Sequence, residues 1–230
     1  MKVYGFQKMT TLDYPGKIAC TVFTGNCNFR CPYCHNASLV LENKEKSEVS
    51  QEEIFSLLKK RRGLLDGVAV TGGEPLINKD IPDFLSKIKE LGYLIKLDTN
   101  GSNPELLKKI VSEKLVDRVA MDIKNSPELY EKTIGVKTDM RLIGESKEFL
   151  LSGQVEYEFR TTLVKGIHTK ESIIRAAEWI KGAKEYYLQS FKDSGDLIAP
   201  EGLDEFSKEE IYGFAEAVRP YVGFVGVRGI

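Results

Sequence analysis

An alternation of strand and helix patterns runs through most of the chain, and this feature most limits its fold. Apolar, β-branched runs predict strands, and a turn and a segment of helical periodicity follow each of them. The expected strands cover residues 17–24, 67–71, 94–98, 118–123, 156–163, 185–189 and 223–227. The expected helices cover residues 54–60, 81–91, 140–151, 170–181 and 208–218, and another starts at Pro104. Six or seven such units predict a parallel sheet closed wholly or partly into a barrel.

No low-complexity linker interrupts this pattern, so we expect one domain over residues 1–230. The predicted fold class is α/β: a single-domain, partial (β/α)6-type, TIM-like barrel with parallel strands over residues 17–230. Residues 1–16 precede the pattern as a short N-terminal appendage, in the form of a hairpin. A barrel of this kind carries its chemistry on the loops that follow the carboxyl ends of the strands.

The charges of the chain nearly cancel, because 33 basic residues face 34 acidic ones and leave a net charge of −1. Such a chain has no overall field that would concentrate nucleic acid or an anionic membrane. The N-terminus lacks the apolar run of a signal peptide, and no stretch approaches the roughly 18 apolar residues of a membrane helix. We therefore expect a cytoplasmic protein with no nucleic-acid or membrane partner.

Three cysteines lie in the loop after the first expected strand, with the spacing C-x3-C-x2-C. This layout is poor for disulfides that join distant loops, whereas reduced thiols suit a metal centre. Cys27, Cys31 and Cys34 can curl around three corners of an iron–sulfur cubane. The fourth iron then has no protein ligand, and an open coordination position is typical of catalytic metal sites.

Two other interpretations of these cysteines stay open. The three thiols and His35 could hold a structural zinc ion, since three cysteines and one histidine form a common zinc site. The protein would then be a structural or redox-sensing module, which metal analysis distinguishes. Packing as unliganded core cysteines fits poorly with the neighbouring Asn, Arg and Gly residues, whereas Cys20 lies within an apolar strand and is expected to be a small core residue.

The cysteine spacing, with Tyr33 before the last cysteine, resembles the signature of the radical S-adenosylmethionine (SAM) superfamily. Further segments resemble the N-terminal region of the glycyl-radical-enzyme activases, among them the activators of pyruvate formate-lyase and anaerobic ribonucleotide reductase. These segments are Asp13-Tyr14-Pro15-Gly16-Lys17, Gly25-Asn26-Cys27 and Cys34-His35-Asn36. The resemblance runs from about Asp13 to at least Lys124, and more loosely to the end. It implies a [4Fe-4S] cluster on Cys27, Cys31 and Cys34, whose open iron binds SAM.

The turn after the second expected strand reads Gly72-Gly73-Glu74-Pro75 and resembles the family motif that receives the amino group of SAM. Glycines allow a ligand to approach the backbone closely, and a carboxylate forms charge-assisted hydrogen bonds with an ammonium group. Alone, this sequence indicates only a tight turn. Its position one unit after the cysteine loop makes it a candidate SAM site.

The resemblance assigns further cofactor contacts to the next two strand ends. Asp122 would accept the ribose hydroxyls, and Lys124 would face the SAM carboxylate. Asp98 and Thr99 would fix the amino-acid end, together with a monovalent cation near Asp98, although Asp98 could instead cap a helix or stabilise a turn. The remaining expected cofactor contacts are Tyr33, His35, Asn100 and Gln189.

The activator of pyruvate formate-lyase has a ribose-contacting histidine near the sixth strand, where this chain has Gln189. The ribose contact on that side therefore stays open. With His35 and His168 as the only histidines, a histidine-centred acid–base mechanism is disfavoured. We expect His168 to cap or pack the loop before the next helix.

The predicted activity is reductive cleavage of SAM to methionine and a 5′-deoxyadenosyl radical, which abstracts a glycine hydrogen from a protein. A compact chain has little material to cover a small substrate, and one cysteine outside the loop excludes an insertion with extra clusters. The segments Thr11-Leu12-Asp13-Tyr14-Pro15-Gly16 and Cys31-Pro32-Tyr33-Cys34-His35-Asn36 most resemble the activating proteins of anaerobic ribonucleoside-triphosphate reductase. That reductase is the expected partner, with flavodoxin or ferredoxin as electron donor. The alternatives are a pyruvate formate-lyase-like partner or a small-molecule substrate.

Overall fold

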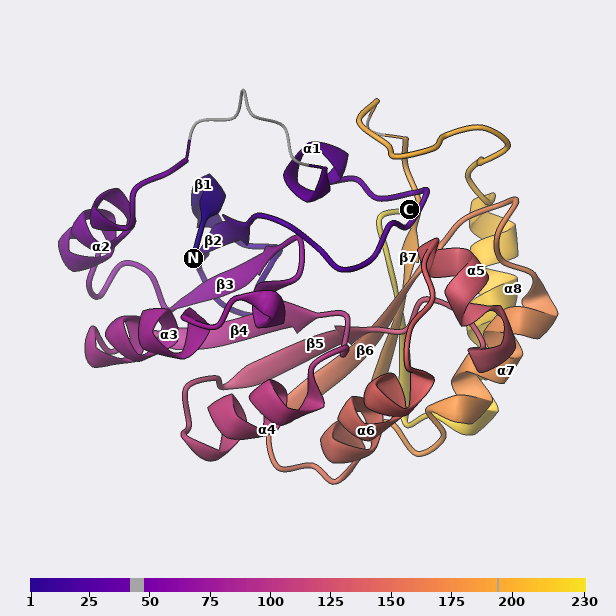
Figure 1. The fold of residues 1–230 in the computed structure, drawn as a ribbon. Coiled ribbons are helices and arrows are strands. Elements are labelled where there is room, and N and C mark those ends of the chain that lie inside the picture. The colour runs from indigo at the N-terminus through magenta and orange to yellow at the C-terminus, as the bar shows by residue number, and fades with distance from the viewer. Residues whose placement is uncertain (42–47, 194) are drawn as a thin grey trace.

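The computed structural model describes residues 1–41, 48–193 and 195–230, and its centre is one eight-stranded sheet in sequential order. The first pair of strands is antiparallel and every later neighbouring pair is parallel (Figure 1). The strands are β1 (Val3–Thr10), β2 (Ala19–Thr24), β3 (Gly67–Gly72), β4 (Leu94–Thr99), β5 (Arg118–Asp122), β6 (Glu156–Leu163), β7 (Glu185–Ser190) and β8 (Phe224–Arg228).

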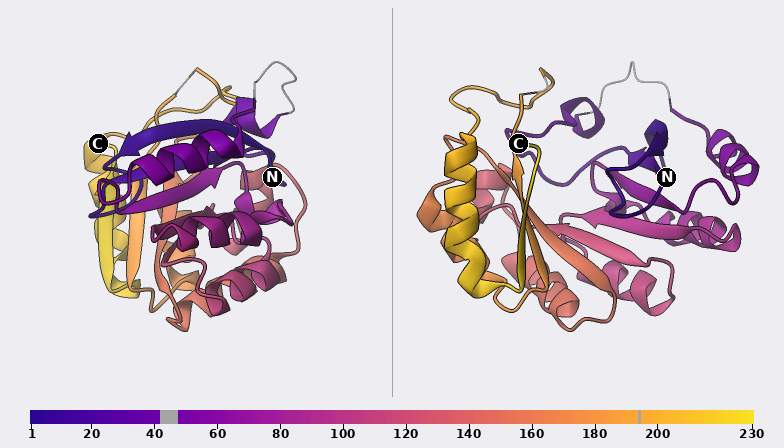
Figure 2. Two further views of the ribbon diagram at one scale, coloured as in Figure 1. Left: turned by 90° about the vertical axis from the view of Figure 1, so that its left-hand side faces the viewer. Right: turned by 180° about the vertical axis from the view of Figure 1, so that it is seen from behind.

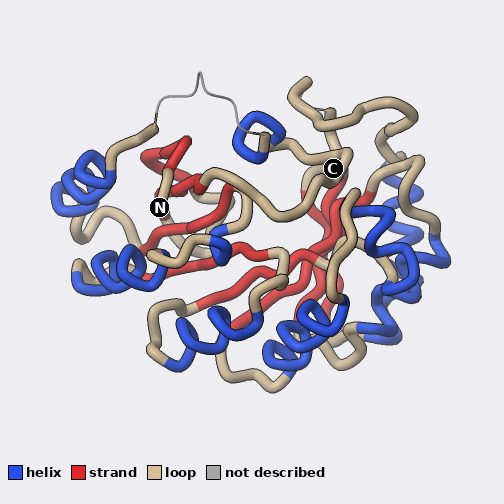
Figure 3. The backbone as a smooth tube through the Cα atoms, viewed as in Figure 1, coloured by secondary structure: helices blue, strands red, loops and turns tan. Residues whose placement is uncertain are grey.

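Helices connect successive parallel strands and cover the outer face of the curved sheet (Figure 3). The α-helices are α1 (Ala37–Val40), α2 (Gln51–Lys60), α3 (Ile81–Glu90), α4 (Pro104–Ser112), α5 (Tyr130–Ile134), α6 (Met140–Leu151), α7 (Lys170–Trp179) and α8 (Lys208–Val218). Short 3-10 helices lie at η1 (Pro75–Ile77), η2 (Pro127–Leu129) and η3 (Arg219–Tyr221). No helix in the described part of the chain is long and apolar enough to cross a membrane.

The sheet curves without closing, since β1 and β8 form its two ends and no pairing joins them among the described residues (Figure 2). The predicted α/β partial barrel is therefore confirmed. Six helical crossovers link the seven parallel strands β2–β8. The carboxyl ends of these strands point toward the loop between β2 and α1, so the loops gather at one end of the barrel.

Local signals account for most of the element boundaries. Ser50 caps α2, because its side chain accepts a hydrogen bond from the backbone N–H of Glu53. Thr169 and Ser207 form full capping boxes at the starts of α7 and α8. The central strands are almost wholly buried, in keeping with a parallel sheet covered by helices.

The structure refines two expectations near the N-terminus and adds two short helices. The expected appendage contains β1, which pairs antiparallel with β2 as an edge strand of the main sheet. The expected strand at 17–24 begins two residues later, at Ala19, because Ile18 is bonded through its N–H to the side chain of Asp66. Helices α1 and α5 were not expected, since four or five residues are too few to show a helical period.

Candidate active site

A cleft of about 390 Å³ lies at the carboxyl ends of the strands. This volume falls within the range of about 300–1,000 Å³ that small-molecule sites occupy. All of the residues assigned to the site from the sequence line this cleft: Cys27, Tyr33, Cys31, Cys34, His35, Gly72, Gly73, Glu74, Asp98, Thr99, Asn100, Asp122, Lys124 and Gln189. The structure therefore brings together residues from the ends of β3, β4, β5 and β7 and from the loop at residues 25–36, which we call the cysteine loop.

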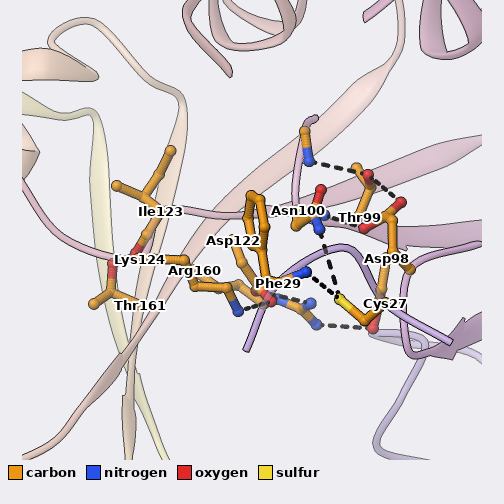
Figure 4. A network of polar contacts seen from close by, with 12 residues as sticks. Cys27, Phe29, Asp98, Thr99, Asn100, Asp122, Ile123, Lys124, Arg160 and Thr161 are labelled. Carbon is orange, nitrogen blue, oxygen red and sulfur yellow. Dashed lines mark hydrogen bonds and ion pairs between the residues drawn. The ribbon is translucent and has the colours of Figure 1, made fainter. Parts of the chain in front are cut away.

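Hydrogen bonds to neighbouring segments hold the cysteine loop over the strand ends. The backbone N–H of Arg30 donates to the carbonyl of Ile134 at 2.8 Å. Within the loop, the backbone N–H of Cys34 donates to the carbonyl of Cys31 at 3.1 Å. The sulfur of Cys27 accepts from the N–H of Phe29 at 3.4 Å and from Asn100 Nδ2 at 3.9 Å (Figure 4). Donors of this kind stabilise a thiolate and tune the potential of an iron–sulfur cluster.

The raised pKa values of the three thiols mean that they would release protons when they bind a cluster. Burial raises the pKa of Cys27 to about 12 and that of Cys31 to about 11, and it also raises the pKa of Cys34. The metal-free thiols are therefore protonated at neutral pH, and metal ligation must displace those protons. Among the described residues, no three His, Cys, Asp or Glu side chains form a site for a single metal ion. A cubane binds each thiolate at a separate iron, so its ligands need not converge.

The aromatic side chains of the cysteine loop pack against later strand ends. The ring of His35 stacks on Phe191, with centroids 5.4 Å apart, and its Nε2 lies 2.7 Å from the carbonyl of Lys192. Tyr33 is buried beside the cleft. The loop is thus bonded to the segment that follows β7 as well as to Asn100, which follows β4, and to α5.

Glu74 joins two successive strand ends through its carboxylate. The Oε1 atom accepts hydrogen bonds from Leu76 N–H at 3.0 Å and Thr99 Oγ1 at 2.8 Å, and Oε2 accepts from Asn100 N–H at 2.6 Å. The residue is only 1% exposed. Burial raises the pKa of Glu74 to about 7, although these three donors oppose the rise. A cationic group in the cleft would favour the carboxylate form.

Gly72 and Gly73, which precede Glu74, lie so close to the end of β2 that neither position has room for a side chain. Gly72 has a φ of +115°, and a Cβ atom on Gly73 would lie 1.8 Å from the carbonyl oxygen of Asn26. The backbone N–H of Glu74 donates to this same oxygen at 2.8 Å. A side chain at Gly73 would therefore separate the cysteine loop from the turn that carries Glu74.

Gly73→Ala is expected to weaken SAM binding and to lower thermal stability, because Asn26 must move away from the turn. Overpacking of this kind costs about 1–3 kcal/mol. Gly213→Ala is the matched control, since a Cβ at this position in α8 meets no atom within 4 Å. That control should raise the melting temperature and leave SAM binding unchanged. Equal behaviour of the two variants in calorimetry and SAM titration would contradict the close contact.

A group of alternating charges forms the floor of the cleft. Arg160 bridges two carboxylates, with Nη1 3.0 Å from Asp98 Oδ2 and Nε 3.0 Å from Asp122 Oδ1 (Figure 4). Lys96 pairs with the other oxygen of Asp98, and Lys124 Nζ lies 2.9 Å from Asp122 Oδ2. The floor thus holds two acids between three cations.

Charge pairing outweighs burial at the two acids. Burial alone would raise the pKa of Asp98, but Arg160 and Lys96 lower it to about 2. The pKa of Asp122 is lowered in the same way by Arg160 and Lys124. Asp98 lies within β4 and α4 is capped by Asn103, so the alternative interpretation of Asp98 as a helix cap is wrong.

Arg160→Met is expected to destabilise the fold by about 3–5 kcal/mol, because two buried carboxylates lose their shared partner. The lowered acid pKa values make both carboxylates stabilising above their unfolded value near 3.8, and this contribution is lost as pH falls toward 2. The loss of unfolding free energy in the variant should therefore be larger at neutral pH than at pH 3. Urea unfolding of both proteins from pH 3 to 8 measures this, and a constant difference would contradict the charge pairing.

The cleft is also lined by residues that were assigned no role from the sequence. They are Asp13, Phe23, Phe29, Asn36, Val40, Thr71, Arg160 and Thr162. Arg160 lies opposite Asp122 in the parallel register of β5 and β6. Period-two alternation places Arg160 and Thr162 on the same face of β6, which was the available signal, but the register of the sheet decides which residues meet.

Comparison with known proteins identifies the family of the chain and agrees with its fold. The family model for the radical SAM superfamily matches residues 21–145. The chain therefore belongs to the radical SAM superfamily, and it is an enzyme whose family uses a [4Fe-4S] cluster and SAM. A Methanocaldococcus jannaschii protein, provisionally named a glycyl-radical enzyme activating enzyme, is 31% identical over 99% of this chain and 96% of its own length. This match assigns the chain to the activating-enzyme branch of the superfamily.

More distant relatives share parts of the same fold. A GTP 3′,8-cyclase of Clostridium botulinum is 26% identical, over 88% of this chain and 70% of its own. A domain of the pyruvate-formate lyase-activating enzyme from Bacteroides vulgatus has a TM-score of 0.57 at 18% identity, covering 71% of this chain and 99% of that domain. Streptococcus suis SuiB, solved with its precursor peptide SuiA, has a TM-score of 0.70 at 13% identity, covering 91% of this chain and 48% of SuiB.

Proposed function

We propose that this enzyme generates a glycyl radical on anaerobic ribonucleoside-triphosphate reductase by reductive cleavage of SAM. The observation that carries the proposal is one cleft lined by three thiols, a buried carboxylate and a floor of paired charges. The relative from M. jannaschii, named for action on glycyl-radical enzymes, and the sequence motifs that resemble reductase activators support it.

Each group in the cleft has a proposed task. Cys27, Cys31 and Cys34 would hold three irons of the cluster and leave the fourth for the amino and carboxylate groups of SAM. Glu74 would accept the SAM ammonium group, which its burial and hydrogen-bonded orientation favour. Lys124 would face the SAM carboxylate.

The other cleft residues would orient the rest of the cofactor. Asp122 would accept the ribose hydroxyls, while Thr99 and Asn100 would position the amino-acid end through the turn that Glu74 holds. Tyr33, His35, Gln189 and the backbone of Gly72 and Gly73 would line the remaining walls. When bound, the cluster supplies one electron that breaks the sulfonium C5′–S bond. The protein contributes orientation and a cleft shielded from water.

The cation predicted near Asp98 stays a prediction. Both carboxylate oxygens of Asp98 already accept hydrogen bonds, one from Lys96 and one from Arg160. A monovalent cation would have to share these oxygens. SAM titrations in potassium and in tetramethylammonium salts test it, and equal affinities would remove the cation from the site.

The chain would act as a single radical SAM domain in the cytoplasm, reduced by flavodoxin or ferredoxin. The sheet is open between β1 and β8, and a protein partner would cover the cleft.

Formation of 5′-deoxyadenosine tests the choice of substrate. The proposal expects anaerobic cleavage of SAM to accelerate when the reductase of the same organism is added. Stimulation by a pyruvate formate-lyase-like enzyme would move the assignment to that partner. Efficient turnover with a metabolite and no protein would favour a small-molecule substrate. One zinc ion per chain, with no iron retained after anaerobic reconstitution, would favour the structural or redox-sensing alternative.

A further inference from the structure

The proposed function leaves one buried histidine near the cleft without a role. His168 is 4% exposed, and burial lowers its pKa to about 4, so the ring is neutral at pH 7. The backbone N–H of Val164 donates to its Nδ1 atom at 3.0 Å. A neutral imidazole has one donor and one acceptor nitrogen, so the hydrogen lies on Nε2. Thr169, the next residue, caps α7, so His168 does not serve as that cap.

The ring of His168 joins two residues that line the cleft. Its Nε2 donates to the carbonyl oxygen of Lys124 at 2.8 Å. Its ring meets that of Tyr33 edge-on, with centroids 6.2 Å apart and planes at 69°. Lys124 comes from the end of β5, and Tyr33 lies between two cysteines of the cysteine loop. His168 therefore contacts both the charged floor and the proposed cluster-binding loop.

The contact with Lys124 completes a set of three hydrogen bonds along residues 122–124. Each carbonyl of this segment accepts from a side chain on a different element. The donors, in order, are Tyr130 Oη at 3.2 Å, Thr161 Oγ1 at 2.6 Å and His168 Nε2 at 2.8 Å. Figure 4 shows the segment with Thr161 beside it. Because the carbonyls are fixed, the two charged side chains of the segment have a defined place in the cleft.

We propose that His168 is a positioning residue for SAM. Its bond to the Lys124 carbonyl and its contact with Tyr33 set the spacing between Lys124 and the cysteine loop. SAM would have to reach both at once, through its carboxylate at Lys124 and through the open iron. The inference rests on the proposed function, because it assumes that SAM binds in this cleft.

Two amide substitutions distinguish the contributions of the two ring nitrogens of His168 to SAM binding. The amide of Gln places a nitrogen near the position of Nε2, so His168→Gln keeps the donor to Lys124 and loses the acceptor for Val164. His168→Asn does the reverse, keeping an oxygen near the position of Nδ1. The Asn variant should raise the dissociation constant for SAM about tenfold or more, and the Gln variant should stay within about threefold of wild type. A purely structural role would move both equally.

The titration is made on anaerobically reconstituted, cluster-loaded protein, and the SAM-induced change in the electron paramagnetic resonance spectrum of the reduced cluster is the readout. Iron and sulfide contents should match wild type in every variant. The control is Tyr93→Phe, which removes a buried donor to the carbonyl of Leu58 at the other end of β4. It should lower stability without changing SAM affinity.

Specific outcomes would overturn the inference. Equal SAM affinity in the Asn and Gln variants would do so, as would an equal loss in Tyr93→Phe. If His168→Asn loads no cluster, His168→Phe replaces it, since it keeps the ring beside Tyr33 and removes the donor. Wild-type affinity in that variant would also overturn the role. A wild-type protein that loads its cluster but binds no SAM would contradict the proposed function instead.

Discussion

Cys31→Ala is expected to abolish the intact cluster and with it all cleavage of SAM. The thiol of Cys31 is one of three on the cysteine loop, and no other cysteine lies among the residues that line the cleft. Removing one of three thiolates leaves an iron without its protein ligand, so the cubane loses its anchorage on that side. Iron and sulfide analysis after anaerobic reconstitution, together with the visible absorbance of the cluster, measures the effect.

Cys20→Ala provides the matched control for this variant. Cys20 is fully buried in β2 and belongs to the hydrophobic core, as expected from the sequence. Its replacement should lower stability by about 1 kcal/mol, as for other small losses of core volume, and leave iron content unchanged. Full iron and sulfide content in Cys31→Ala would refute the ligand assignment. Loss of iron in Cys20→Ala as well would show that the assay reports folding.

Glu74→Gln is expected to weaken SAM binding by about 10- to 100-fold while the cluster remains in place. The substitution removes the charge proposed to receive the SAM ammonium group. It also places an amide nitrogen at one of the two carboxylate oxygens, of which Oε1 accepts from Leu76 and Thr99 and Oε2 accepts from Asn100. Isothermal titration with SAM measures the affinity, and iron analysis of the same sample shows whether the cluster is retained.

Asp117→Asn is the matched control for Glu74→Gln, because it also removes a carboxylate that bonds to a neighbouring strand. Asp117 accepts from the backbone N–H of Ile95 at 2.7 Å and from Lys89, at the amino end of β5 and away from the cleft. This variant should lose stability and keep its SAM affinity. If Glu74→Gln bound SAM as tightly as wild type, Glu74 would be a structural residue of the turn only.

Much of the fold follows from periodicity. The expected helix at residues 140–151 matches α6, and the strand at 156–163 matches β6, because both have long, regular patterns. The partner of β1 could not be predicted in this way, since Val3–Thr10 has three successive exposed residues and little alternation. Its antiparallel place depends on contacts with β2.

The site residues that belong to local sequence motifs could be predicted. Those whose role depends on contacts between distant parts of the chain could not. The cysteine spacing and the Gly72-Gly73-Glu74 turn identified two walls of the cleft. Arg160 received no role because its two carboxylate partners lie 62 and 38 residues away along the chain. The contact of His168 with Lys124 spans 44 residues and is likewise a product of the fold.

The most direct measurement is anaerobic electron paramagnetic resonance on the reconstituted enzyme mixed with reductant, SAM and anaerobic ribonucleotide reductase from the same organism. The account predicts a glycyl doublet that requires every component and disappears with Cys31→Ala. Cleavage of SAM to 5′-deoxyadenosine without any doublet on the reductase would contradict the proposed partner. Absence of both the doublet and SAM cleavage from cluster-loaded enzyme would contradict the proposed activity itself.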